Sequence, residues 1–216
     1  MFITVAGNMG SGKSTLVARL AELLNWTPLF ESVDDNPYLE KFHAPDVSAE
    51  EKRRHALPLQ MHFLEHRARS HLRMQESTLE SFIQDRSIYE GREVFLLNLV
   101  DTGLLSEAEY QKYVARYDEL IQTLRPPPLM VYLKRSLAGL ERQINQRSRA
   151  FELALPAGFL ANLNGLYERW FDGYSLGPKL ILDGDSLDFV QRPEDMTEIR
   201  RKIEFALSSI QARASS

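Results

Sequence analysis

The chain has 216 residues, of which 44% are hydrophobic and 26% are charged, a composition typical of one globular domain and unlike that of a disordered or fibrous protein. Its net charge of −4 provides no overall positive field for holding nucleic acid or an anionic membrane. Cysteine is absent, which excludes disulfides, thiolate metal sites and cysteine nucleophiles. We expect a single domain over residues 1–216, with a fraying tail over residues 211–216.

The N-terminal segment Phe2–Ala6 is apolar, lacks a basic region before it and runs directly into a glycine-rich loop. This pattern predicts a first strand and not a signal peptide. The longer apolar runs are too short to cross a bilayer. We therefore expect a cytoplasmic protein with neither a membrane nor a nucleic-acid partner.

Short β-rich segments alternate along the chain with longer segments of helical spacing. The expected strands are Phe2–Ala6, Pro28–Ser32, Ser81–Asp85, Leu129–Leu133 and Lys179–Leu182. The expected helices cover Thr15–Leu24, Gln60–Met74, Ile88–Val100 and a segment that starts at the capping-box sequence Ser106–Glu109 and runs towards Leu124. This alternation predicts an α/β fold, a five-stranded parallel sheet flanked by helices on both faces. Ligands of such sheets bind beyond the carboxyl ends of the strands.

A glycine-rich loop follows the first predicted strand. It matches the pattern G-x-x-x-x-G-K-[ST], in which backbone N–H groups surround phosphate oxygens. Lys13 would reach the β- and γ-phosphates and Ser14 would ligate Mg²⁺. We expect ATP to bind the loop and the residue after it: Gly7, Asn8, Met9, Gly10, Ser11, Gly12, Lys13, Ser14 and Thr15.

The loop alone names no reaction, because GTPases, motor ATPases and small-molecule kinases all use one. The chain lacks the Asn-Lys-x-Asp segment that reads guanine, and it is short for a motor ATPase. A compact kinase for a small acceptor is therefore favoured.

Charged residues also follow the second and third predicted strands. Glu31 ends the second, and Asp85-Arg86 ends the third. An acceptor hydroxyl needs a carboxylate to take its proton and a cation to balance the charge of the transferred group, so Glu31, Asp85, Arg86 and Lys13 are the expected catalytic residues. Either acid can be the proton acceptor, and Asp85 can instead hold Mg²⁺. The alternative is a simple salt bridge between Asp85 and Arg86, with Glu31 as a solvated turn residue.

Arginines cluster after the fourth predicted strand. Arg147 and Arg149 lie where a lid over residues 142–152 would close on the nucleotide and stabilise the transferred phosphoryl group. A solvated helix face is the alternative interpretation.

Taken together, these segments resemble the deoxynucleoside kinase family, specifically its bacterial deoxyadenosine/deoxyguanosine kinase branch. The resemblance covers nearly the whole chain, and its most specific segments are the Gly7–Ser14 loop, Glu31 with Asn36–Phe42, Leu59-Gln60, Asp85–Glu90, Arg147–Arg149 with Glu152, and Asp183–Asp185. It implies a P-loop kinase fold with a helical lid. It also implies Mg·ATP-dependent phosphorylation of the 5′-hydroxyl of a deoxynucleoside, with purines favoured.

The resemblance further assigns roles to single residues. Glu31 and Arg86 would contact the 5′-hydroxyl, Gln60 would hydrogen-bond the base, and Glu152 would take the 3′-hydroxyl. Asp185 would border the adenine of ATP. A homodimer through Gln60–Met74 and Ile88–Val100 is also implied.

Three positions depart from the family pattern. His43 stands near where a sugar-binding Tyr is often found, and Gln143 replaces a lid Arg, for which the adjacent Arg142 can substitute. Gly91 stands where many relatives have an acid or another side chain near the base. Gly91 is thus expected to leave room in the substrate pocket, which puts the choice of base in doubt. Two other functions stay open, a thymidylate-type nucleoside monophosphate kinase and a non-catalytic nucleotide-binding regulatory module.

Overall fold

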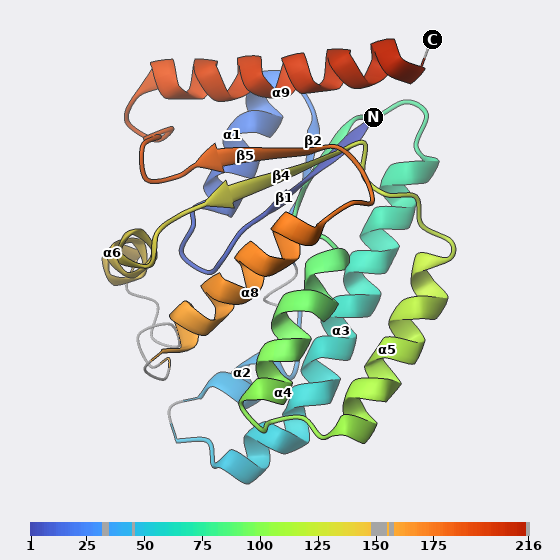
Figure 1. The fold of residues 1–216 in the computed structure, drawn as a ribbon, viewed down its shortest axis with the longest axis vertical. Helices are drawn as coiled ribbons and strands as arrows, with labels where there is room; N and C mark the ends of the chain where they lie inside the picture. Colours follow the sequence, from blue (N-terminus) through green and yellow to red (C-terminus); the bar gives the residue numbers. More distant parts are fainter. Residues whose placement is uncertain (32–34, 45, 148–154, 156–157, 215–216) are drawn as a thin grey trace.

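The computed structural model describes residues 1–31, 35–44, 46–147, 155 and 158–214 (Figure 1). Its centre is a sheet of parallel strands in the order β2-β3-β1-β4-β5. The strands are β1 (Phe2–Ala6), β2 (Thr27–Leu29), β3 (Phe82–Asp85), β4 (Leu129–Lys134) and β5 (Lys179–Asp183). The predicted five-stranded parallel sheet is confirmed, and β1 is buried along its whole length between its two neighbours.

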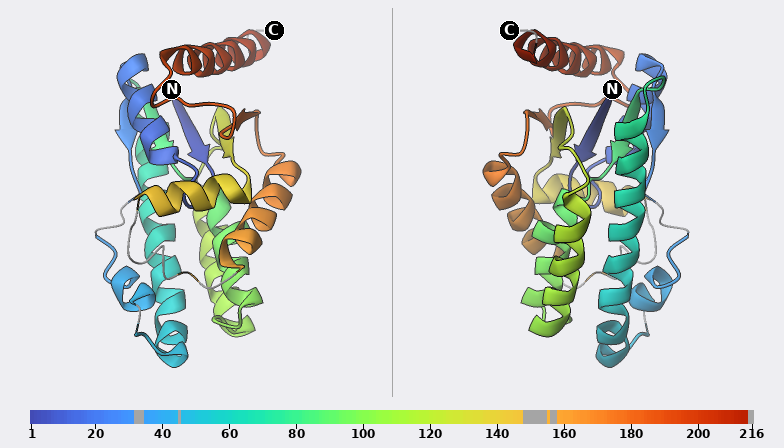
Figure 2. Two further views of the ribbon diagram at one scale, coloured as in Figure 1. Left: turned by 90° about the vertical axis from the view of Figure 1, so that its left-hand side faces the viewer. Right: turned by 90° about the vertical axis from the view of Figure 1, so that its right-hand side faces the viewer.

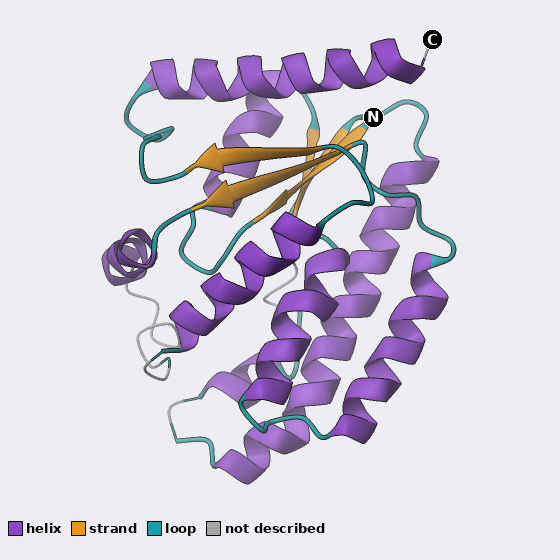
Figure 3. Cartoon of the chain, viewed as in Figure 1, coloured by secondary structure: helices purple, strands orange, loops and turns teal. Residues whose placement is uncertain are grey.

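Helices cover both faces of the sheet, as Figures 2 and 3 show. On one face, α1 (Lys13–Leu24) and α9 (Pro193–Ala214) pack against apolar side chains that include Val5, Val131 and Leu182. On the other face lie α3 (Ala49–Glu76), the π-helix η1 (Gly91–Leu96), α4 (Leu97–Asp101), α5 (Glu107–Ile121) and α8 (Phe159–Gly173). Two short elements, α2 (Leu39–His43) and α6 (Leu137–Arg147), flank the carboxyl edge of the sheet.

The strand and helix boundaries differ from the prediction in places that matter for the site. β2 ends at Leu29, so Glu31 lies just beyond the strand and not within it; Ser32 lies outside the described residues. Helix α3 begins at Ala49, well before Gln60. A capping box between Ser48 and Glu51 starts it, and Pro58 lies inside it.

The remaining differences are local. The segment predicted as one helix over Ile88–Val100 is a π-helical turn followed by α4. The capping box at Ser106 and Glu109 is confirmed, and the helix it starts ends at Ile121. Residues 211–214 belong to the last turn of α9, and residues 215–216 of the predicted tail lie outside the described residues. Among the helices of the described ranges, none is both long and apolar enough to span a membrane.

Candidate active site

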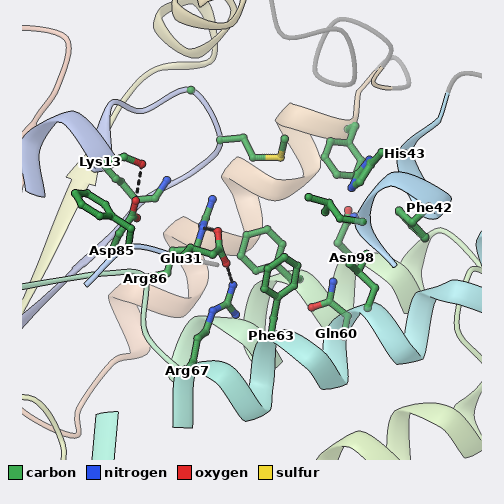
Figure 4. A pocket seen from close by; sticks show the side chains of 18 of the residues that line it. Lys13, Glu31, Phe42, His43, Gln60, Phe63, Arg67, Asp85, Arg86 and Asn98 are labelled. Carbon is green, nitrogen blue, oxygen red and sulfur yellow. Dashed lines mark hydrogen bonds and ion pairs between the residues drawn. The ribbon is translucent and has the colours of Figure 1, made fainter. Parts of the chain in front are cut away.

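A cavity of about 570 Å³ opens at the carboxyl ends of β1 and β3, beside the glycine-rich loop (Figure 4). Its wall includes residues of the loop and α1, Phe30 and Glu31 after β2, and Asp85-Arg86 at the end of β3. One face of α3 and residues of η1, α4 and α8 complete it. The chain therefore brings Lys13, Ser14, Glu31, Asp85 and Arg86 to one space, as the positions of the strand ends predicted.

The glycine-rich loop has the backbone that its sequence predicts. Gly10 and Gly12 have φ angles of 75° and 95°, a region that side-chain-bearing residues rarely adopt. A Cβ on Gly10 would also lie 2.8 Å from Ile144 of α6, so α6 packs directly on the loop. Lys13 Nζ donates to the Asn8 carbonyl at 2.9 Å. Burial, followed by the nearby Arg86, lowers the pKa of Lys13 to about 8, so Lys13 is mainly cationic at neutral pH.

Ser14 and Asp85 form a contact suited to a divalent cation. Ser14 Oγ donates to Asp85 Oδ2 at 2.5 Å, and the buried Asp85 Oδ1 has no hydrogen-bond partner among the described residues. Hard cations such as Mg²⁺ take oxygen ligands of this kind and complete their shell with water and phosphate. No cluster of three or more metal-binding side chains occurs in the described part of the chain, so phosphates would have to supply further ligands.

Glu31 lies between two buried arginines (Figure 4). Its Oε2 accepts from Arg86 Nε at 2.8 Å, and its Oε1 accepts from Arg67 Nη2 of α3. Burial alone would raise the pKa of Glu31, but Arg67 and Arg86 lower it to about 2. Glu31 is therefore ionised at all physiological pH values, with both oxygens engaged by cations.

Arg86 is fixed from several sides. Its backbone has a φ of 68° and its N–H donates to the Val5 carbonyl at 2.9 Å, which turns the side chain back across the end of β1. Nη1 donates to the Gly7 carbonyl at 3.1 Å and to the Tyr167 hydroxyl of α8. Burial would lower the pKa of Arg86, but Tyr167 and Glu31 raise it, so the guanidinium stays charged.

Sequence reasoning missed two charged residues of this cluster. Arg67 lies seven positions after Gln60, so both side chains fall on one face of the predicted helix, but this spacing alone does not indicate a partner for Arg67. Glu90 is completely buried, accepts from the Ser87 backbone N–H at 3.2 Å and lies 3.8 Å from Arg86. Burial raises the pKa of Glu90, although Arg86 and Arg67 oppose the change.

The far end of the cavity carries neutral polar groups. Gln60, His43 and Asn98 lie there beside Phe42 and Phe63 (Figure 4). Burial, together with Lys52, lowers the pKa of His43 to about 4, so its imidazole is neutral at pH 7. Asn98 was not predicted. Its Oδ1 accepts from Asn162 of α8 at 2.7 Å.

The other predicted site residues fall into three groups. Arg147 ends α6 and lines the cavity, whereas Arg149 and Glu152 lie outside the described residues. Asp185 follows β5 away from the cavity wall; it accepts from the Ser136 N–H at 2.8 Å and lies 3.7 Å from Arg135.

Gly91 is buried but does not line the cavity. A Cβ there would lie 2.8 Å from the Tyr113 hydroxyl and 3.1 Å from Arg67 Nη1. The room that we expected at Gly91 is therefore already taken by these two side chains.

Comparison with known proteins agrees with this arrangement. The family model "Deoxynucleoside kinase" matches residues 3–208, nearly the whole chain. The chain belongs to the deoxynucleoside kinase family.

Relatives of this family match along most of their own length. The deoxyadenosine/deoxycytidine kinase of Bacillus subtilis is 33% identical over 91% of this chain and 88% of the relative. The deoxyguanosine kinase of Lactobacillus johnsonii is 31% identical over 93% and 90%. The solved deoxyadenosine kinase of M. mycoides with bound dATP has a TM-score of 0.80 at 23% identity, covering 94% of this chain and all of that one, which shows a shared fold.

The ion pairs of Glu31 with Arg67 and Arg86 predict that the stability of the fold depends on pH. Because the pKa of Glu31 is about 2 in the folded chain and ordinarily about 4.5, ionised Glu31 stabilises the fold above pH 4.5, and this contribution is lost as the pH falls towards 2. Glu31→Gln leaves Arg67 and Arg86 without their shared counter-charge and should lower the unfolding free energy at pH 7 by about 3 kcal/mol. The deficit should shrink as the pH is lowered from 4.5.

Urea unfolding of both proteins between pH 7 and 3 measures this difference. Glu65→Gln, which removes a half-exposed partner of Arg116, is the control and should cost little at any pH. A Glu31→Gln deficit that is absent at pH 7, or that grows as the pH falls, would contradict the assignment.

Proposed function

We propose that this chain transfers the γ-phosphoryl group of ATP to the 5′-hydroxyl of a deoxynucleoside, with purine deoxynucleosides favoured, and releases the 5′-monophosphate. The observation that carries the proposal is one cavity whose charged end holds Lys13, Asp85 and Arg86 and whose other end holds Gln60 among aromatic rings. Membership of the deoxynucleoside kinase family supports the same reaction.

On the donor side, the loop residues Gly7 to Thr15 would hold the ATP phosphates through backbone N–H groups and Lys13. Arg147 and Arg149 would approach the transferred phosphoryl group, and Asp185 would border the adenine. Ser14 and Asp85 would hold Mg²⁺, whose contribution is to neutralise charge on the β- and γ-phosphates. Asp85 Oδ1, which has no hydrogen-bond partner in the described part of the chain, supports this role.

On the acceptor side, Glu31 and Arg86 would meet the 5′-hydroxyl. If Asp85 serves the metal, Glu31 is the acid left to accept the hydroxyl proton. Its low pKa makes it a weak base, but in a loose transition state the proton leaves late and the position of the carboxylate matters most. Arg86 would balance the charge that develops on the transferred group.

The neutral end of the cavity would hold the nucleoside. The Gln60 amide offers a donor and an acceptor together, which suits a base edge. His43 and Glu152 would contact the sugar, while Gly91 stays behind the wall and is no longer proposed as a contact. The two relatives described above act, by their names, on at least one purine deoxynucleoside each, which supports the purine preference.

The two alternatives are less well supported. A thymidylate-type kinase needs a cation beside the γ-phosphate for the acceptor's own phosphate, yet Arg67 and Arg86 at that end of the cavity are both paired with Glu31. A regulatory module that only binds nucleotide has no need for Glu31 and Arg86 beside the phosphate loop. The cytoplasmic location and the absence of a nucleic-acid partner stay predictions.

A panel of acceptors tests the reaction. With ATP and Mg²⁺, the purified chain should form monophosphates from deoxyadenosine or deoxyguanosine with a higher kcat/KM than from deoxycytidine or thymidine. Thymidylate should not be phosphorylated, because the Glu31 carboxylate already pairs with Arg67 and Arg86 where the phosphate of thymidylate would lie. Chromatographic detection of products decides the matter: a preference for thymidylate, or nucleotide binding without transfer to any acceptor, would refute the proposal.

Replacing Asp85 should abolish most turnover without unfolding the chain. Asp85→Asn removes a charge from the contact with Ser14, and we expect kcat to fall by roughly 10²–10⁴, the range for groups that act in proton transfer or metal binding. Steady-state kinetics with deoxyadenosine provides the measurement. Asp118→Asn, the same change at an exposed ion pair with Arg92, should leave kcat unchanged. Undiminished turnover of Asp85→Asn would remove this residue from the mechanism.

We also propose that the chain forms a homodimer through the helices over Gln60–Met74 and Ile88–Val100. Much of one α3 face is occupied in the structure, because Gln60, Phe63 and Arg67 line the cavity. The partner would therefore have to use the remaining surface of these helices. Light scattering at micromolar concentration should give a mass near twice that of one chain; a single-chain mass would contradict this proposal.

A further inference from the structure

Arg86 is held in a way that leaves one nitrogen for substrate. Nε donates to Glu31, and Nη1 donates to both the Gly7 carbonyl and the Tyr167 hydroxyl. Nη2 has no hydrogen-bond acceptor among the described residues, and Arg86 lines the cavity, so Nη2 can contact a bound substrate. The guanidinium of an arginine is planar, so the three bonds made by Nε and Nη1 together set the direction of Nη2.

Tyr167 is built into the molecule as a rigid contact. It is completely buried on α8, and its ring stacks on Tyr132 of β4, with centroids 6.0 Å apart and planes at 11°. Phe95 of η1, which also lies over the Arg86 guanidinium at 4.7 Å, packs edge-on against the same ring. Burial raises the pKa of Tyr167, so the hydroxyl keeps its proton at neutral pH.

Helix α8 also contacts the phosphate loop, through residues that precede Tyr167 on the same helix. The Asn8 side-chain amide donates to the Leu160 carbonyl at 3.3 Å and to Asn164 Oδ1 at 3.4 Å. Residues three positions apart lie on the same side of a helix. One side of α8 therefore contacts the loop through Asn164 and Arg86 through Tyr167.

We propose that Tyr167 is a positioning residue for the proposed kinase reaction: its hydroxyl fixes Arg86 Nη1 so that Nη2 is directed at the 5′-oxygen and the γ-phosphate. Tyr167 does not line the cavity, so it acts through Arg86 alone. Interactions that orient a group for the transition state affect kcat more than substrate binding. The inference rests on the proposed function for its kinetic consequence, although the hydrogen bond itself does not.

Tyr167→Phe tests this proposal, because it removes one oxygen and leaves the packed ring. We expect kcat to fall by about 10- to 100-fold, the scale of losing one orienting hydrogen bond, with KM for ATP and deoxynucleoside within about twofold of wild type. Tyr132→Phe and Tyr174→Phe are matched controls, since both hydroxyls are buried and lack a hydrogen-bond partner among the described residues. Both should keep the wild-type kcat.

A second measurement does not depend on activity. In ¹⁵N NMR spectra of the arginine side chains, rotation of the Arg86 guanidinium should be equally slow in the wild-type chain and in both controls. It should be faster in Tyr167→Phe, which keeps only the contacts of Arg86 with Glu31 and Gly7. Wild-type kcat in Tyr167→Phe, or a lower melting temperature with kcat unchanged, would overturn the inference. If no deoxynucleoside is phosphorylated by the wild-type chain yet guanidinium rotation changes as predicted, the proposed function fails and the positioning of Arg86 by Tyr167 stands.

Discussion

The site depends on a cluster of opposite charges that the chain buries before any ligand arrives. Lys13, Arg67 and Arg86 are each less than a tenth exposed, and Glu31 and Asp85 lie among them. A buried cation without a counter-charge costs several kcal/mol, so the arginines and Glu31 fix one another's positions. Such an arrangement needs little reorganisation when charge develops on a transferred phosphoryl group, which is the source of most electrostatic catalysis.

The sheet explains why residues so distant in the sequence meet. β1 and β3 are neighbours, with Val5 opposite Asp85, so the loop after β1 and the acid that ends β3 share one edge of the sheet. β2 lies outside β3 and delivers Glu31 to the same edge. Helix α8 packs beside these residues and contacts two of them, Asn8 through Asn164 and Arg86 through Tyr167.

Local patterns were enough to predict the strands, the phosphate loop and the residues at the strand ends. The Gly7–Ser14 motif, the capping box at Ser106 and Asp85-Arg86 can each be read from short segments. Arg67 and Glu90 could not, because their role arises from burial against distant charges and not from their neighbours in sequence. The start of α3 was missed because Pro58 interrupts the helical pattern of its first turns. The expectation of free space at Gly91 was wrong because Tyr113, which fills that space, belongs to a separate helix.

A crystal structure of the chain with deoxyadenosine and a non-hydrolysable ATP analogue tests this account most directly. It should show the 5′-oxygen within hydrogen-bonding distance of Glu31 and Arg86 Nη2, with the γ-phosphate at Lys13. Arg86 should still contact Gly7 and Tyr167, because the cluster is assembled in advance. A nucleoside bound outside the cavity, or an Arg86 that leaves Glu31 and Tyr167 to reach the ligand, would contradict the central claim.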